Sequence, residues 1–125
     1  MLVVAVVMAF VWSVTSSSAA SAQASQSHKV KSLEIRILST MLADEGFGEW
    51  GFAALVEVDG RRILFDTGAN EDTVQRNLKV MKLDLSNVEH VILSHNHADH
   101  TTGLLTLRRQ FAATSPKALS TVYAG

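Results

Sequence analysis

The sequence predicts one small α/β domain behind an uncharged N-terminal segment. Apolar runs with strand periodicity and with helix periodicity alternate through the chain after residue 32. A cluster of histidine and aspartate directly follows a short apolar run, the position at which α/β architectures bind ligands. The length of 125 residues allows one domain or part of a larger one.

Composition excludes several classes of function. With 11 basic and 12 acidic residues, the net charge of −1 gives no electrostatic case for a nucleic-acid or anionic-membrane partner. The absence of cysteine excludes disulfides, thiolate metal sites and a cysteine nucleophile. We therefore expect no nucleic-acid partner.

The first 24 residues contain no charged side chain. Residues 1–14 form an apolar run, shorter than the roughly 20 residues that span a bilayer. Small residues follow and offer Ala-x-Ala at Ala20–Ala22 and Ala22–Ala24, which predicts a signal peptide over 1–24 and an exported protein, periplasmic or secreted, with no stable membrane partner after cleavage. No Lys or Arg precedes the apolar run, so an uncleaved anchor stays open. Residues 25–32 are then a polar linker, and 33–125 the domain.

Three strands are expected first. Leu33–Ile37 alternates apolar and polar residues, which predicts a half-buried strand. Residues 44–51 contain three glycines and are expected to form a loop. Phe52–Val58 and Arg61–Phe65 flank Asp59-Gly60, a dipeptide that favours a tight hairpin between two antiparallel strands.

A helix is expected next. Asn70 is a residue type that caps helix N-termini, and Val74, Leu78 and Met81 follow at the spacing of one apolar helix face. Residues 83–88 are expected to connect this helix to the next strand.

The last part of the chain repeats the strand and helix alternation. His90–Leu93 is a short apolar run that predicts a buried strand. After Gly103, Leu104, Leu107 and Phe111 predict a second helix that ends before Pro116, because the residue before proline disfavours helical geometry. A final strand is expected over 119–124.

The chemically informative segment lies between that buried strand and the second helix. His95, His97, Asp99 and His100 place three imidazoles and one carboxylate within six residues, and these groups bind zinc and similar divalent metals. In an extended segment residues two apart face the same way, so His95 and His97 can hold one ion together. Asp99 and His100 follow a turn and can address a second ion or a bound water. The sequence therefore predicts a metal site.

These residues carry a resemblance to a known family. Residues 93–100 resemble the His-x-His-x-Asp-His signature of the metallo-β-lactamase fold, and Ile63–Gly68 resembles its first motif, a strand that ends in aspartate. The likeness covers residues 33–111 and looks most like the dihydropterin synthase-like branch. It implies an αββα sandwich of four layers, of which this chain is the N-terminal portion, with antiparallel strands over 33–65 and the histidine loop at one edge.

The resemblance also implies roles for the residues. His95 and His97 would bind the first metal, Asp99 and His100 the second, and Asp66 would orient the ligand loop. A complete site would hold two Zn²⁺ ions, with Mn²⁺ or Fe possible. Metal-bound hydroxide would attack a small ester, lactone or phosphoester, while Asp99, as the catalytic residue, orients the nucleophile or transfers its proton.

The sequence departs from the family pattern at two places. Thr102 stands where the family usually has glycine after the histidine motif. The family also completes its site with a later histidine, a bridging acid and a final histidine, and no His, Asp or Glu follows His100 here. We therefore expect a truncated metallo-β-lactamase-like domain that is inactive alone.

Two other interpretations stay open. Asp66-Thr67-Gly68 after an apolar strand is also the triplet of a retropepsin-like aspartic protease, although this leaves the histidines unexplained. The histidine cluster also suits a non-catalytic metal-binding module. In the Gly-rich loop, Phe47 and Trp50 are expected either to overhang a substrate or to pin the loop to the core.

Overall fold

The computed structural model describes residues 29–125, so the expected signal peptide and residues 25–28 of the linker lie outside the described residues. The elements in chain order are β1 (Leu33–Ser39), β2 (Ala53–Val58), β3 (Arg61–Phe65), α1 (Thr73–Val80), β4 (His90–Leu93), α2 (Ala98–Thr101), α3 (Leu104–Ala112) and β5 (Thr121–Ala124). The five expected strands and both expected helices are present. The single-turn helix α2 is an addition that the sequence patterns did not predict.

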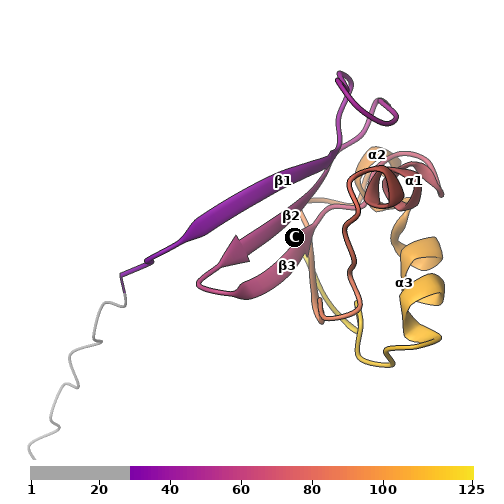
Figure 1. Cartoon of the computed structure of the whole chain (residues 1–125). Coiled ribbons are helices and arrows are strands. Elements are labelled where there is room, and N and C mark those ends of the chain that lie inside the picture. The colour runs from indigo at the N-terminus through magenta and orange to yellow at the C-terminus, as the bar shows by residue number, and fades with distance from the viewer. Residues whose placement is uncertain (1–28) are drawn as a thin grey trace, which may run out of the picture.

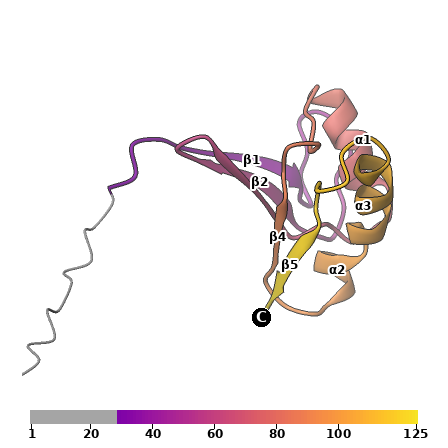
Figure 2. The same ribbon diagram turned by 90° about the horizontal axis from the view of Figure 1, so that it is seen from below.

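The strands form one mixed sheet in the order β1-β2-β3-β4-β5. The pairs β1–β2 and β2–β3 are antiparallel, as expected for the segment 33–65. The pairs β3–β4 and β4–β5 are parallel, so each of these connections crosses over through helices. Figure 1 and Figure 2 show α1, α2 and α3 together on one side of the sheet, an α/β arrangement with one sheet layer and one helix layer.

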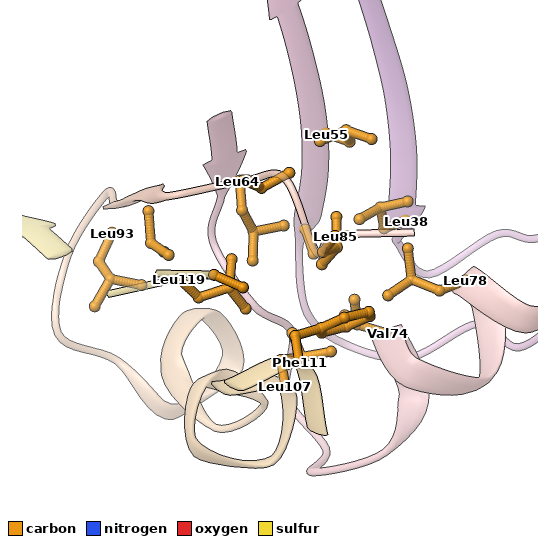
Figure 3. Packing of buried hydrophobic residues seen from close by; sticks show 14 residues of the cluster. Leu38, Leu55, Leu64, Val74, Leu78, Leu85, Leu93, Leu107, Phe111 and Leu119 are labelled. Atoms are coloured by element: carbon orange, nitrogen blue, oxygen red, sulfur yellow. The ribbon is translucent and has the colours of Figure 1, made fainter. Parts of the chain in front are cut away.

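The hydrophobic core lies between this sheet and the helices. Figure 3 shows side chains of α1 and α3 packed toward those of the strands and of the loop between α1 and β4. Each part of the core contributes fully buried side chains: Leu64 from β3, Val91 from β4, Leu85 from the connector between α1 and β4, and Leu107 from α3. Burying a leucine or valine side chain contributes about 1.5–3 kcal/mol, so this layer stabilises the end of the sheet that carries the histidine segment.

The expectation that β1 is half-buried through its apolar face was wrong. Leu33, Ile35 and Ile37 are 61%, 54% and 40% exposed, and burial in β1 begins only at Leu38. Figure 1 shows the start of β1 extending beyond the helices. The alternation does predict the strand, but within residues 29–125 no element covers this apolar face. Residues 29–125 therefore form one sheet layer and one helix layer, two of the four layers that the resemblance implies.

The expected helix cap was also wrong. Helix α1 has Asp72 at its N-cap position, without a side-chain capping hydrogen bond, and Asn70 instead donates to the carboxylate of Glu49. The expected stripe residue Met81 is 39% exposed, while Asn77 is buried in α1. Among the helices of residues 29–125, none combines the length and apolar character needed to cross a membrane.

Candidate metal centre

The histidine segment leaves the carboxyl end of β4 and enters α2. His95, Asp99 and His100 each offer one ligand atom, and these three atoms all lie within 4.8 Å of one another. His97 is exposed and is not part of this group, although its ring lies 4.5 Å from that of His95, centroid to centroid. The predicted sharing of one ion by His95 and His97 therefore stays a prediction.

Asp66 lies behind these ligands at the end of β3. Strands β3 and β4 are parallel neighbours, so their carboxyl ends meet at one edge of the sheet. Asp66 is 1% exposed and has a φ of +55°, a left-handed conformation that aspartate tolerates better than most residues. Its Oδ1 accepts from the Ser94 amide at 2.7 Å, and its Oδ2 accepts from Ser94 Oγ at 2.8 Å and lies 2.7 Å from His100 Nδ1.

These contacts determine which imidazole nitrogens are free. A carboxylate only accepts, so His100 donates to Asp66 from Nδ1, and in the neutral imidazole this leaves the Nε2 lone pair free. The single hydroxyl hydrogen of Ser94 also goes to Asp66, so Ser94 Oγ accepts from His95 Nδ1 at 3.0 Å. His95 is thereby left with a free Nε2 as well. Two imidazole lone pairs are thus prepared for a metal before any metal binds.

Asp99 supplies the carboxylate of the cluster from the first turn of α2. Its Oδ2 lies 3.5 Å from His100 Nε2, the nitrogen that Asp66 leaves free. The Asp99 side chain is about one third exposed, so solvent reaches this side chain. Its backbone carbonyl accepts from the Phe52 amide at 3.1 Å, which fixes α2 against the start of β2.

Close backbone packing holds the surrounding loops. Thr67 donates from its amide and its hydroxyl to the His100 carbonyl, at 2.7 and 3.0 Å. A Cβ at Gly103 would lie 2.2 Å from the Thr67 carbonyl oxygen, so this approach requires glycine. Thr102 has the ordinary helical angles φ −63° and ψ −36° and donates to Ala98, so its replacement of the family's glycine is accommodated without strain.

Glu49 is a site residue that the sequence patterns missed. It lies in the loop expected over residues 44–51, yet it is only 8% exposed. Burial by itself raises the pKa of Glu49, but hydrogen bonds from Ser39, Thr73, Ala69 and Asn70 lower it by more, so the pKa lies below its ordinary value. No apolar pattern marks such a residue, because its burial depends on donors that are distant in sequence.

The two aromatic residues of this loop differ in environment. Phe47 donates from its amide to Asn77 Oδ1 at 2.7 Å, and the Arg76 guanidinium lies 3.4 Å from its ring centroid. Phe47 therefore pins the loop to α1. Trp50 is 74% exposed, one residue before Gly51, whose Cβ position would be 2.8 Å from the Asp99 carbonyl. The interpretation of a residue that overhangs a substrate remains available only for Trp50.

The donor set fits a divalent metal. Two imidazoles and a carboxylate are the ligand types of catalytic zinc sites, which leave a coordination position for water or substrate. The same geometry does not fit an aspartic protease, because the Asp66 carboxylate is buried and occupied by Ser94 and His100. It has no free face toward a second aspartate.

The chain therefore combines a mixed sheet covered by helices on one side (Figure 2) with a His/Asp/His group at the carboxyl ends of parallel strands. The model of the metallo-beta-lactamase superfamily matches residues 51–123, and the chain belongs to this superfamily.

The relatives of this chain differ in the activity that their names give. The 7,8-dihydropterin-6-methyl-4-(beta-D-ribofuranosyl)-aminobenzene-5'-phosphate synthase of Methanocaldococcus jannaschii is 33% identical over 89 residues, covering 66% of this chain and 30% of that protein. Ribonuclease Z of Borrelia duttonii is 38% identical over 53 residues, covering 42% of this chain and 16% of that protein. The chain thus spans less than a third of the length of these relatives.

Solved structures share the fold. Human tRNase Z, short form, matches with a TM-score of 0.52 and 24% identity, covering 64% of this chain and 30% of that one. A diphosphatase from the PhnP family matches with a TM-score of 0.52 and 20% identity, covering 75% and 43%. The expected relation to the metallo-β-lactamase fold is therefore confirmed, and the first relative above belongs to the expected dihydropterin synthase-like branch.

Proposed function

We propose that the protein is a metal-dependent hydrolase of a small ester, lactone or phosphoester, with zinc as its metal. The observation that carries the proposal is the convergence of His95, Asp99 and His100 within 4.8 Å, with the Nδ1 atoms of both histidines held from behind. Superfamily membership supports a metal-dependent hydrolase in general. The names of the two curated relatives, a ribonuclease and a 5'-phosphate synthase, favour a phosphoester among the three substrate classes.

The chain's own residues would act in distinct ways. A divalent ion bound here supplies Lewis-acid activation of water near neutral pH. His95 and His100 would hold it through Nε2, and the exposed His97 lies close enough to His95 to join them. Asp99, at the solvent-facing side of the cluster, would accept and pass on a proton. Asp66 would keep His100 in the tautomer that coordinates.

Metal binding is the first test. In equilibrium dialysis at pH 7.5, we expect the wild-type chain to bind Zn²⁺ or Mn²⁺ and the double variant His95→Ala/His97→Ala to lose stoichiometric binding. The matched control is His28→Ala/His90→Ala, which removes two histidines outside the cluster and should bind as the wild type does. Equal loss in both double variants would show that the site has been placed wrongly.

Hydrolysis is the second test. Zinc-loaded protein is assayed with p-nitrophenyl acetate, bis(p-nitrophenyl) phosphate and a γ-lactone, before and after addition of a chelator. Chelator-sensitive turnover that Asp99→Asn abolishes supports the hydrolase. Zinc binding without turnover of any substrate would instead favour the metal-binding module. We also propose that the turnover of this chain alone is low but above that of the chelator-treated protein, because three or four ligands from one short segment hold a metal weakly.

Export remains a separate proposal from residues 1–24. N-terminal sequencing of the protein recovered from a secreting host should show a mature chain that starts near Ser25. A chain that retains Met1 and remains in the cytoplasm would contradict it.

A further inference from the structure

Three segments that are distant in sequence meet beside the candidate metal centre: the loops 49–52 and 66–70, and residues 97–103 with helix α2. Gly68 donates from its amide to the Phe52 carbonyl at 2.9 Å, and Phe52 donates to the Asp99 carbonyl. The ligand segment therefore contacts both other loops through backbone groups. Backbone contacts of this kind transmit the position of one loop to the next.

Glu49 is the charged group at the centre of this assembly. Its Oε1 accepts from Ser39 Oγ at 2.6 Å and from the Ala69 amide at 3.0 Å. Its Oε2 accepts from the Asn70 amide at 2.9 Å and from Asn70 Nδ2 at 2.7 Å. One carboxylate thus joins the end of β1 to the turn that follows Asp66.

The Glu49 carboxylate is surrounded by neutral hydrogen-bond donors. No salt bridge to Glu49 occurs within residues 29–125, so N–H and O–H donors alone compensate its charge. Gly68, with a φ of +81°, permits this approach, because a Cβ there would lie 2.2 Å from Glu49 Oε1. Glutamine would place an amide NH₂ group against two of these donors, and so cannot replace glutamate without loss.

We propose that Glu49 is a positioning residue for the metal centre, which fixes the 66–70 turn and thereby the Asp66 carboxylate that orients His100. Glu49 touches none of the ligands, and it acts through the turn and through Gly51, whose backbone packs against Ala69 and Asp99. The inference rests on the proposed function, since it concerns the affinity and geometry of the same site.

The test compares Glu49→Gln with two controls. Glu45→Gln changes an exposed glutamate of the same loop, and Val88→Ala removes buried volume at the opposite end of β4. Zn²⁺ affinity is measured by isothermal titration calorimetry at a temperature where circular dichroism shows every variant folded. Co²⁺-loaded protein reports the coordination geometry through its visible absorption spectrum.

We expect Glu49→Gln to weaken Zn²⁺ binding about tenfold and to alter the Co²⁺ spectrum, as loss of outer hydrogen-bond partners does in metal sites. Val88→Ala should lower the thermal stability with neither change, and Glu45→Gln should change nothing. If Glu49→Gln does not fold, Asn70→Ala is used instead, which removes the hydrogen bond from the exposed Asn70 side chain to Glu49 and should weaken Zn²⁺ binding about threefold.

The inference, but not the proposed function, would be overturned if the folded Glu49→Gln variant had the Zn²⁺ affinity and Co²⁺ spectrum of the wild type. If that variant does not fold, the same result for Asn70→Ala would overturn it. The same loss of affinity in Val88→Ala would also overturn it, because it would show an effect of stability. A wild-type chain that binds neither Zn²⁺ nor Co²⁺ would overturn the proposed function, and this inference with it.

Discussion

Replacing Asp66 by asparagine tests how the ligand histidines are prepared. Asparagine retains the shape of aspartate and tolerates the φ of +55°, so the backbone need not move. The amide oxygen can keep the bond from the Ser94 amide, which places the NH₂ group at the position of Oδ2. There it faces Ser94 Oγ and His100 Nδ1, both of which donate to the native carboxylate.

The magnitude follows from these two contacts. A hydrogen bond to a charged group contributes about 1.5–3 kcal/mol, and Ser94 and His100 can recover part of the loss by reversing their roles. We therefore expect Asp66→Asn to lower the free energy of unfolding by about 2–4 kcal/mol. When His100 reverses, its proton moves to Nε2, the atom proposed to bind metal, and zinc affinity should fall by about 10–100-fold.

Urea unfolding measures the stability, and titration calorimetry with Zn²⁺ measures the affinity. The control is Asp84→Asn, because Asp84 accepts from the Ser86 amide and hydroxyl as Asp66 does from Ser94, but in an exposed turn. We expect this control to change the free energy of unfolding by less than about 1 kcal/mol and to leave zinc binding unchanged. Wild-type zinc affinity in Asp66→Asn would refute the role assigned to Asp66.

Three further predictions follow from packing and charge. Gly103→Ala should lower the free energy of unfolding by more than about 2 kcal/mol, because the new Cβ would clash with the Thr67 carbonyl oxygen. Gly60→Ala should lower it by only about 1 kcal/mol, because open space surrounds Gly60 and only its φ of +81° is unfavourable for alanine. Equal losses for the two variants in urea unfolding would contradict this prediction. Because the pKa of Glu49 is lowered in the folded state, the ionised carboxylate stabilises the fold fully above its ordinary pKa of about 4.3. This stabilisation is lost as the pH falls through the folded pKa. Between pH 6 and pH 3, the free energy of unfolding should therefore decrease less in Glu49→Gln than in the wild type. We expect the exposed apolar face of β1 to promote self-association, and Ile35→Lys on this face should reduce it in sedimentation velocity. The same sedimentation profile for variant and wild type would argue against self-association through this face.

The sequence predicted the strands because their signals are local. Alternation in Leu33–Ile37, the Asp59-Gly60 turn and the apolar run His90–Leu93 each need only a few neighbouring residues to be recognised. The candidate metal ligands were equally visible, since all four candidate residues lie within six positions. The single turn of α2 was missed, because four residues are too few to show helical periodicity.

Burial of polar residues was not predictable from the same patterns. Asn77 is buried because its Nδ2 donates to the carbonyls of Leu38 and Phe47, 39 and 30 residues away. Glu49 is buried for a similar reason, by donors from Ala69 and Asn70. An apolar pattern identifies residues that avoid water, and it is silent on polar residues whose partners only the fold brings near. The exposure of Ile35 is the converse case, because alternation marks an apolar face without showing what covers it.

The ligands and their supports come from different parts of the chain, and this separation has a chemical consequence. His95, Asp99 and His100 belong to one segment of six residues, which by itself has many conformations and would bind a metal at a high entropic cost. The support comes from the end of β3, where Asp66 fixes His100, and from Glu49, which fixes the turn beyond it. Substitution of the proposed ligands should therefore lower the stoichiometry of metal binding. Substitution of Asp66 or Glu49 should leave the ligands in place and lower only the affinity for the metal. A decrease in affinity with retained stoichiometry is the result that distinguishes support from ligation.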